Sequence, residues 1–425
     1  MRRGRAAGSR TVGRMVTDEV AAFGRARVAV TTAFAAHGLI AAAWVVRIPQ
    51  IKEHLGLGEG SMGVALLGAP VGVVAAVRFA GRIVARWGSR ATTIAAGTAA
   101  AASLVPIGLA WNLGALVFAL LLFGASMGLM DVAMNAQGVA VERGYGRPLM
   151  SGLHGWYSIG TLAAALAGSG VAYLGVPVPL HLAAAAAALA ALVAVGCRGL
   201  LDRSADVLHE QRPRLPEDHG PDGRDPGGHG PGARTAAPSS RWMLAMLGVI
   251  GLCSFVGEGA MADWSAIYLR EYLGTDPGFA GLGYAGCAVA MTAGRFGGDR
   301  VVARFGPVPV LRTGSLVAAL GLGCGLLSGQ PAVAVAGFTL FGLGIAVVAP
   351  VTFSAAGNLP GVPAAAGISR VTGVGYLGLL GGPPVIGFVA QGVGLTWALA
   401  VPVGLVGLIV LLAPATAAAA AAADR

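Results

Sequence analysis

Twelve apolar runs of about 20 residues each follow one another along the chain, and this feature restricts its fold more than any other. A helix of that length crosses the hydrocarbon core of a bilayer, where every backbone N–H and C=O must find its partner within the protein. The sequence therefore predicts an all-α integral membrane protein with twelve transmembrane helices. The expected spans are 27–46, 60–80, 91–110, 113–140, 150–174, 178–199, 242–269, 278–297, 307–328, 332–357, 368–391 and 394–414.

The composition excludes a water-soluble globular protein. Of the 425 residues, 56% are hydrophobic and 11% are charged, whereas soluble domains carry roughly 25% charged residues. The cysteines lie in apolar runs without a C-x-x-C pair, so we interpret them as small buried apolar side chains. They are Cys197, Cys253, Cys287 and Cys324. We expect neither a metal site nor a cofactor.

Polar segments divide the chain into two groups of six spans. We expect a cytoplasmic tail at 1–25, an N-terminal bundle at 26–200, a linker at 201–240, a C-terminal bundle at 241–415 and a low-complexity cytoplasmic tail at 416–425. The linker is rich in Gly, Pro and charge, which predicts disorder. Its histidines could bind a metal, but they fit a solvated linker better; they are His209, His219 and His229.

The basic residues predict the orientation in the membrane, because Lys and Arg accumulate in cytoplasmic loops. The N-terminal tail, the linker and alternate loops are basic, whereas the outer loops carry only Arg47, Lys52 and Arg270. We therefore expect a multi-pass protein of the plasma (inner) membrane with both termini in the cytoplasm. We attribute the net charge of +10 to this topology, which contacts between the basic residues and anionic membrane lipid would reinforce. It gives no reason to expect nucleic-acid binding.

The two halves of the chain resemble each other. The segment "GRIVARWG" at 81–88 matches "DRVVARFG" at 299–306, and "FGASMGLMDV" at 123–132 matches "FGLGIAVVAP" at 341–350. Both pairs are separated by the same step in residue number, which we call the repeat offset, and this indicates a duplicated six-helix unit. Because six is an even number, the two bundles have the same orientation and are related by an axis along the membrane normal.

Twelve spans, the duplication, the central linker and a basic G/D-R-x-V-x-R-x-G segment after the second span of each half resemble the major facilitator superfamily over residues 26–415. The segments "WVVRIP", "MDVAMNAQGVAVE", "LHGWYSIG" and "GEGAMADWSAIYLR" are similar to its fucose-permease-like bacterial branch. The resemblance implies the major facilitator fold, with two pseudo-symmetric six-helix bundles. It also implies alternating access, in which the bundles rock around a central cavity.

The basic segment of each half is a candidate cytoplasmic gate, with Arg82 and Arg86 in the first half and Arg300 and Arg304 in the second. The resemblance implies an aspartate that latches the cytoplasmic side at the start of this segment. The second half has Asp299 there, and the first half has Gly81. Because a helix N-terminus attracts a carboxylate, we expect Asp299 to contact the start of the span at 150–174, near His154. We expect no symmetric latch at Gly81. The alternative is that the arginines only anchor the topology.

Polar side chains inside the spans are the candidate substrate or proton-coupling residues, because a charge at the bilayer centre costs at least about 2.5–3.5 kcal/mol. They are His37, Asp131, Asn135, Glu258 and Asp263. His37 and Glu258 lie near the midpoints of 27–46 and 242–269. Each is followed directly by Gly, and Trp44 and Trp264 follow seven and six residues later. We expect both at similar depth in the cavity, with Asp263 nearer the outer end. For His37 the alternative is an interhelical hydrogen bond.

The span at 113–140 and the residues after it carry a polar stripe. At about 100° per residue, Asn135 lies roughly 40° from Asp131 and Glu142 roughly 20° from it, whereas Gln137 lies about 120° away. A short hairpin leads into the span at 150–174, so we expect Asp131 or Asn135 to meet His154. The alternative is a polar clamp that only holds this hairpin. The matching positions of the second half are apolar, which favours a specific role for the stripe in the first half.

Two transport functions fit these patterns. The first is a secondary active transporter of a small polar solute, with sugars as one candidate class, driven by protons. The alternative is a proton-driven exporter of drugs or other amphipathic compounds, with a cavity formed by Trp44, Trp156 and Trp264. The missing proline of the antiporter signature at 160–170 weighs against the exporter. We find no nucleotide-binding or hydrolase motif and expect no enzyme. The expected partners are solute, protons and lipid, around a monomer.

Overall fold

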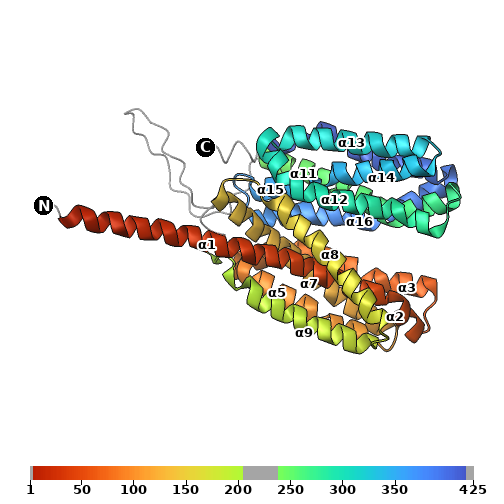
Figure 1. Ribbon diagram of the computed structural model, residues 1–425, viewed down its shortest axis with the longest axis horizontal. Helices are drawn as coiled ribbons and strands as arrows, with labels where there is room; N and C mark the ends of the chain where they lie inside the picture. The colour runs from red at the N-terminus through yellow and green to blue at the C-terminus, as the bar shows by residue number, and fades with distance from the viewer. Residues whose placement is uncertain (1–2, 204–237, 418–425) are drawn as a thin grey trace.

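The computed structural model describes residues 3–203 and 238–417, which form twelve helical spans in two bundles (Figure 1). The first bundle contains α1 (Arg3–Ala42), η1 (Val45–Arg47), α2 (Ile48–His54), α3 (Glu59–Leu66), α4 (Gly68–Trp87), α5 (Ser89–Ala102), α6 (Leu104–Gly108), α7 (Leu113–Tyr145), α8 (Met150–Tyr173), α9 (Val178–Gly196) and η2 (Cys197–Gly199). The second contains α11 (Pro238–Ile267), the π-helical turn η3 (Tyr268–Tyr272), α12 (Pro277–Phe305), α13 (Pro307–Leu327), α14 (Pro331–Ile345), α15 (Val348–Gly357), α16 (Ala364–Val393), α17 (Leu395–Ala398), α18 (Ala400–Leu412) and η4 (Ala413–Thr416).

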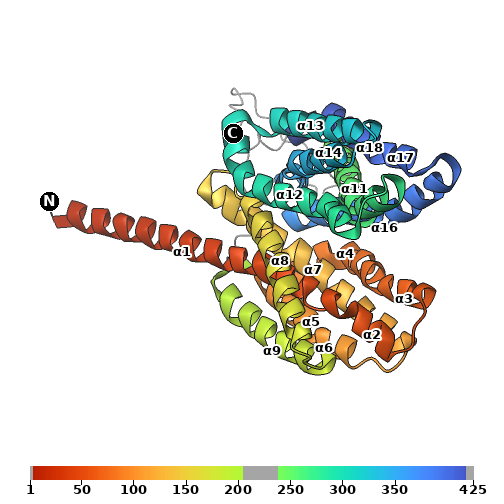
Figure 2. The ribbon, with the colours of Figure 1, turned by 45° about the vertical axis from the view of Figure 1, so that its right-hand side comes forward.

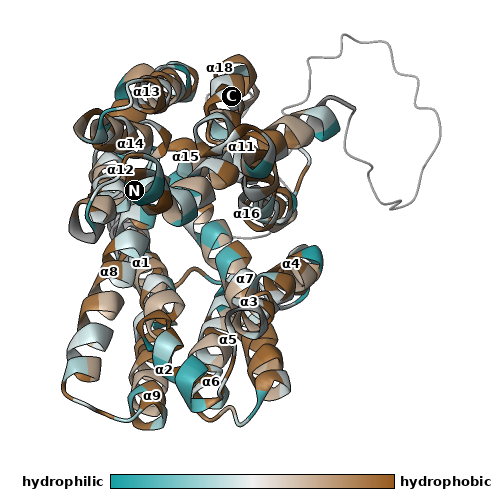
Figure 3. Ribbon diagram, turned by 90° about the vertical axis from the view of Figure 1, so that its right-hand side faces the viewer, coloured by the Kyte–Doolittle hydropathy of each residue, from teal (hydrophilic) through white to brown (hydrophobic). Residues whose placement is uncertain are grey.

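The all-α fold with two bundles confirms the predicted class. Figures 1 and 2 show α1 to α9 in one bundle and α11 to α18 in the other, with α8 and α12 meeting between them. Apolar residues occupy much of the helix surfaces, and polar residues collect toward their ends (Figure 3). Residues 204–237 of the linker and 418–425 of the tail lie outside the described residues. The disorder and the histidines predicted for the linker fall in the first of these ranges. The exact domain boundaries stay a prediction.

Several helices, α1, α4 and α12 among them, extend beyond their expected spans into charged sequence. α1 begins at Arg3 rather than after a tail, because residues 1–25 contain no proline that would stop a helix. α4 and α12 continue to Trp87 and Phe305, so the basic segments expected in loops are the last turns of helices. Arginines in a last turn are favourable because the C-terminal end of the helix dipole is negative.

The duplication extends to the turns. Gly56 and Gly274 have φ of 61° and 67°, and Gly88 and Gly306 have φ of 84° and 80°. The residues of each pair are separated by the repeat offset. A positive φ is strained for a residue with a Cβ, so glycine ends the preceding helix at the same place in both halves.

The helix crossings are duplicated as well. Gly124 on α7 lies against the backbone of Ala69 on α4, and Gly342 on α14 lies against the backbone of Cys287 on α12. The repeat offset relates both members of the first contact to those of the second. In both places a Cβ on the glycine would overlap the facing backbone. Small residues therefore allow these helices to pack closely, which matters because apolar burial does not drive helices together within lipid.

The bundles meet through α8 against α12 and through α4 against α16. The polar bonds between them, described below, lie at the end that carries the α4–α5, α7–α8 and α12–α13 turns; we call it the basic end and the other one the opposite end. Ten helical spans of the described chain are long and apolar enough to cross a membrane, and α8 and α12 are not among them. These two helices are more polar because they turn polar side chains toward each other instead of toward lipid.

Candidate functional site

A buried arginine, Arg295 on α12, joins the two bundles. Its Nη1 donates a hydrogen bond of 2.8 Å to Oγ of Ser158 on α8, and its Nη2 lies 3.6 Å from Oε2 of Glu258 on α11. The side chain of Arg295 is 8% exposed, whereas that of Glu258 is 33% exposed. Glu258 is therefore the accessible member of an ion pair whose cation is held inside the protein.

Arg295 is not among the candidate residues that the sequence indicates, although it lies inside the expected span 278–297. In the sequence, Arg295 lies shortly before Asp299 and the arginines that follow it. It can therefore be mistaken for part of a basic loop. The signal that identifies it is its position within an apolar run, where an unpaired guanidinium would be costly. Such a residue requires a counter-ion inside the bundle, and Glu258 is that counter-ion.

Three tyrosines lie within range of the charge of Glu258. They are Tyr157 on α8, Tyr284 on α12 and Tyr376 on α16. The tyrosines therefore come from both bundles. Hydroxyl groups that both donate and accept suit a site for a polar solute. Sequence reasoning missed them because tyrosine in an apolar span is also common at membrane interfaces.

Asp131 faces the same region from the first bundle. It lies on α7, is 8% exposed, and its Oδ1 accepts a hydrogen bond of 3.1 Å from Nδ2 of Asn135. The same amide also donates to the backbone oxygen of Asp131, at 2.8 Å. The Asp131 charge acts on Tyr157 and Tyr376. The site thus has one carboxylate from each bundle, and the charges of both act on Tyr157 and Tyr376.

The glycine contacts of α1 and α11 define their register. Gly160 on α8 lies against the carbonyl oxygen of Ala35 on α1, and its equivalent Gly378 on α16 lies against the carbonyl oxygen of Leu252 on α11. Ala35 of α1 therefore occupies the same place in the first bundle as Leu252 of α11 in the second.

That register corrects the expected equivalence of His37 and Glu258. His37 corresponds to Ser254, and Glu258 lies one helical turn farther toward the opposite end. His37 is 5% exposed, and its Nε2 lies 3.3 Å from the backbone oxygen of Met127 on α7. The motif of Gly followed by Trp suggested equal depth, but the packing of the glycines determines it. His37 therefore makes an interhelical hydrogen bond, which is the alternative to a role in substrate binding or proton coupling.

His154 does not meet Asp131 or Asn135 through its Nδ1, which instead lies 2.9 Å from the backbone oxygen of Met150 in its own helix. Its ring lies 5.0 Å from that of Phe34 and stacks on that of Phe353, at 5.7 Å, between ring centroids. The expected contact fails because the first turn of α8 already offers an acceptor. His154 instead packs across the bundle interface through Phe353 of α15.

The three tryptophans lie apart. Trp44 is buried against Phe123, Trp156 is 45% exposed beside Phe296, and Trp264 packs against α16 at Gly387. Three indoles with three different neighbours form no common aromatic wall, so the cavity proposed for amphipathic compounds is not supported. Asp263 is exposed on the part of α11 nearer the opposite end.

Asp299 reaches the first turn of α8 from the second bundle. Its Oδ1 accepts from the backbone N–H of Ser151, at 2.9 Å, and its Oδ2 accepts from that of Gly152, at 2.7 Å. These donors have no intrahelical acceptor, and the positive end of the helix dipole adds to the attraction. A Cβ on Gly152 would lie 2.7 Å from Oδ2 of Asp299, so glycine leaves room for the carboxylate.

Glu142 caps the other free donors of the same helix from within the first bundle. Its Oε2 accepts from the backbone N–H of Leu149, at 2.7 Å, and from that of Met150, at 3.0 Å. Its Oε1 accepts from the hydroxyl of Ser354 on α15. The four initial N–H groups of α8 are therefore divided between two carboxylates, one from each bundle.

Arg143 makes the complementary contact at a helix C-terminus. Its guanidinium donates to the backbone oxygen of Gly357 and to Oδ1 of Asn358, at the end of α15. Asp299 thus binds a helix start and Arg143 binds a helix end, and both of these contacts cross between the bundles. Gln137 is different, since it binds Ser89 and Leu201 within the first bundle.

Equivalent serines bridge the bundles in both halves. Oγ of Ser151 donates to the backbone oxygen of Arg295, at 2.7 Å, and Oγ of Ser369 donates to that of Val77, at 2.5 Å. The repeat offset separates the two donors and also the two acceptors. The interface between the bundles thus follows the sequence duplication.

The duplication breaks where Gly81 replaces an aspartate. α8 begins at Met150 and leaves the N–H of Gly152 free, but α16 already begins at Ala364, so the equivalent N–H of Arg370 lies inside the helix. No free donor remains there for a carboxylate. A Cβ on Gly81 would lie 3.2 Å from Cα of Ala366, so the helices approach closely instead.

The candidate gate arginines lie along the solvent-facing sides of α4 and α12; they are Arg82, Arg86, Arg300 and Arg304.

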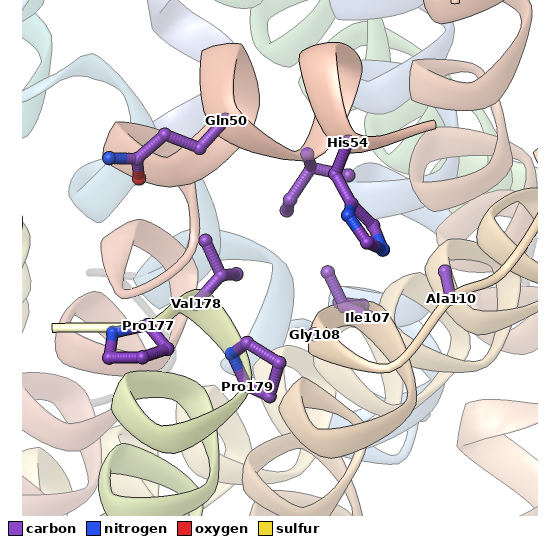
Figure 4. A pocket seen from close by; sticks show the side chains of 9 residues that line it. Gln50, His54, Ile107, Gly108, Ala110, Pro177, Val178 and Pro179 are labelled. Carbon is purple, nitrogen blue, oxygen red and sulfur yellow. The ribbon is translucent and has the colours of Figure 1, made fainter. Parts of the chain in front are cut away.

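A pocket of about 240 Å³ opens at the opposite end of the first bundle (Figure 4). Its lining is mostly apolar and includes Gln50, His54 and Pro177, and it lies away from Glu258. Nearby, Arg47 is fully buried and donates to Nδ1 of His181, at 3.1 Å, and to Gln50. The sequence predicts Arg47 in an outer loop at the end of the first span. The structure places it in η1, where side chains of α2 and α9 accept its hydrogen bonds.

Three of the cysteines are buried as expected, and Cys324 is exposed on α13. This difference has a physical reason, since α13 is an outer helix on which a thiol can face lipid. Within residues 3–203 and 238–417, no group of three or more His, Cys, Asp or Glu side chains gathers in a way that could hold a metal ion.

Fold and site together define a class of membrane protein: two six-span bundles related by duplication, with a charged site between them. The chain is 36% identical over 391 residues to an uncharacterized MFS-type transporter of Yersinia pestis, covering 92% of this chain and 94% of that protein. It is 31% identical over 371 residues to the membrane protein MosC of Rhizobium meliloti, covering 87% and 85%. The chain therefore belongs to the major facilitator superfamily. It is a multi-pass membrane transporter and not an enzyme.

Solved structures show the same fold. The Escherichia coli fucose:proton symporter FucP matches with a TM-score of 0.70 and 17% identity, over 91% of this chain and 97% of that one. A structure of FucP in the outward conformation matches with a TM-score of 0.68 over the same shares. The proton:xylose symporter XylE matches with a TM-score of 0.68 and 13% identity, over 92% and 95%. No protein-family profile matches the chain.

Proposed function

We propose that the protein transports a small polar solute by alternating access and couples this movement to protons. The observation that carries the proposal is the pairing of Glu258, which is 33% exposed, with Arg295, which is 8% exposed, between the two bundles. A carboxylate that water can reach and that a buried cation holds can bind and release a proton. The surrounding tyrosine hydroxyls and Asp131 supply polar contacts for a solute.

Sugars are the first solute class to test. FucP is a fucose:proton symporter and XylE is a proton:xylose symporter. At 17% and 13% identity the likeness concerns the fold alone, so the argument for a polar solute rests on the hydroxyls and charges of the site. The exporter of amphipathic compounds has less support, because the three tryptophans do not share a cavity.

We further propose that the basic end faces the cytoplasm of a bacterial plasma membrane, with both termini on that side, and that the protein acts as a monomer. Positive charge at that end supports the orientation. The bonds of Asp299, Glu142 and Arg143 across the bundles support closure of the basic end in this conformation. The solute site then opens toward the outside.

Uptake into proteoliposomes tests the function. With the outside acidified, radiolabelled fucose or xylose is expected to accumulate in vesicles that contain the protein, and an ionophore that dissipates the pH gradient is expected to abolish accumulation. A thermal-shift screen of the purified protein against sugars, amino acids and drugs extends the search, because binding to the folded state raises its stability. Uptake without any response to the pH gradient contradicts proton coupling. Stabilisation by amphipathic drugs alone would favour the exporter.

The variant Asp131→Asn tests the first-bundle carboxylate. Asparagine keeps the shape of the side chain and can still meet the amide of Asn135, so we expect normal membrane insertion and an unchanged thermal transition. Uptake should fall roughly tenfold or more, since a charge-assisted contact contributes about 1.5–3 kcal/mol. Gln137→Glu does not serve as a control because Gln137 holds the bundle together; Asn112→Asp, at the start of the same helix, does. Normal uptake by Asp131→Asn would reduce Asp131 to a packing residue.

A further inference from the structure

We infer that Arg295 changes partners during the transport cycle. While the basic end is closed, the guanidinium of Arg295 contacts both Ser158 of the first bundle and Glu258 of the second. When the basic end opens, the guanidinium contacts Glu258 alone. This exchange rests on the proposed proton coupling and assigns it a physical device. Arg295 is then a positioning residue that links the gate to the proton site.

The contact with Ser158 depends on closure of the basic end. α8 and α12 are joined there by the hydroxyl of Ser151, which donates to the backbone oxygen of Arg295, and by Asp299, which accepts from Ser151 and Gly152. Ser158 lies two turns along α8 from these bonds. Rocking of the bundles that separates the start of α8 from α12 must therefore also remove Ser158 from the guanidinium.

The contact with Glu258 survives the same movement. Glu258 and Arg295 lie on α11 and α12 of one bundle, which pack against each other, so bundle rocking leaves them together. In the closed conformation the contact is loose, because 3.6 Å exceeds an ordinary N–H···O hydrogen bond. Nε of Arg295 is buried and has no hydrogen-bond partner among the described residues. The guanidinium thus has a free donor available when it turns fully to Glu258.

The exchange expels a proton from Glu258. While the basic end is closed, the hydroxyl of Ser158 is one acceptor for the guanidinium; once Ser158 has moved away, the guanidinium turns to Glu258, whose ionised carboxylate accepts hydrogen bonds from a cation more strongly than its protonated form does. Groups on the neighbouring helices that face Glu258 are Tyr157 of α8, Tyr284, Cys287 and Arg295 of α12, and Tyr376 of α16. Of these, Arg295 is the cation. Opening therefore favours proton release on the basic side, and an acidic medium favours closure.

Distance measurements test this exchange without a known solute. Spin labels on Trp87→Cys and Phe305→Cys, exposed positions at the basic ends of α4 and α12, report the opening of the basic end in nanodiscs. The exposed Cys324 is replaced by Ser in this protein so that it takes up no label. In otherwise unchanged protein, the open fraction should be higher at about pH 8 than at about pH 5. Ser158→Ala should raise the open-to-closed ratio at the acidic pH roughly tenfold, the effect of one hydrogen bond to a charged group, with little change at the alkaline pH. The pH response should therefore shrink.

A matched variant and a second substitution complete the design. Thr161→Ala removes another hydroxyl of α8, one that bonds to the backbone oxygen of Tyr157 in the same helix, and should keep the full pH response. Arg295→Gln should lose that response, and retained thermal stability excludes misfolding as the reason. If Ser158→Ala and Arg295→Gln both respond to pH like the parent, the exchange is wrong while proton coupling stands. If the parent itself does not respond, both proposals fail.

Discussion

Proton-driven uptake is expected to disappear in the variant Glu258→Gln. The amide cannot take up a proton, and it leaves the buried guanidinium of Arg295 without its counter-ion. A hydrogen bond to a charged group contributes about 1.5–3 kcal/mol, which corresponds to a loss of roughly 10- to 100-fold in a step that needs the pair. Uptake of labelled fucose or xylose into proteoliposomes under an inward proton gradient measures this loss.

The matched control is Glu271→Gln. Glu271 is exposed in η3, at the opposite end of the same span, so its neutralisation removes one negative charge from the span without touching the ion pair. It should keep the parental uptake rate. Exchange of solute across vesicles at equal pH separates binding from coupling, because Glu258→Gln can retain exchange while losing accumulation. Accumulation at the parental level in Glu258→Gln would show that the proton moves through another group.

Opening of the basic end is the expected result of Asp299→Ala. The substitution removes both acceptors of the Ser151 and Gly152 N–H groups, and each hydrogen bond to a charged group contributes about 1.5–3 kcal/mol. Two such bonds amount to about 3–6 kcal/mol, so the closed conformation should lose stability by roughly 100- to 10,000-fold in population. Val139→Cys reports this change, since Val139 is fully buried and meets Gly357 where α7 and α15 cross between the bundles. Its reaction with a hydrophilic maleimide should accelerate by the same factor.

Asp202→Asn is the control for this measurement. Asp202 forms an exposed ion pair with Arg90 inside the first bundle, and exposed pairs contribute little to stability. Labelling of Val139→Cys should therefore be unchanged. Equal labelling in Asp299→Ala and the parent would mean that Glu142 and Arg143 close the basic end without Asp299.

Local sequence features predicted much of the fold. The apolar runs fix the number of spans because a bilayer accepts a helix only at a minimum length. The repeat offset predicted the pairing of halves, and the structure repeats it in the glycine turns, the glycine crossings and the serine bridges. Asp299 could be placed because a free carboxylate and a helix start form a recognisable pair.

The site itself was only partly predictable. Asp131 and Glu258 can be identified because burial of a carboxylate needs a reason, but Arg295 is hidden in sequence beside a basic turn. The mistake about His37 has the same origin. Its depth relative to Glu258 depends on Gly160 and Gly378 against α1 and α11, and a short motif such as Gly before Trp does not report that contact.

The sequence by itself determined the spans, their duplication and which side chains are too polar for lipid. Each of these depends on the length and polarity of one segment in its solvent. Only the tertiary structure decided that Arg295 lies between Ser158 and Glu258, that two carboxylates share the start of α8, and that α16 begins too early to need one. These outcomes depend on the register between helices that are far apart in the chain. That register follows from where small residues let two backbones touch.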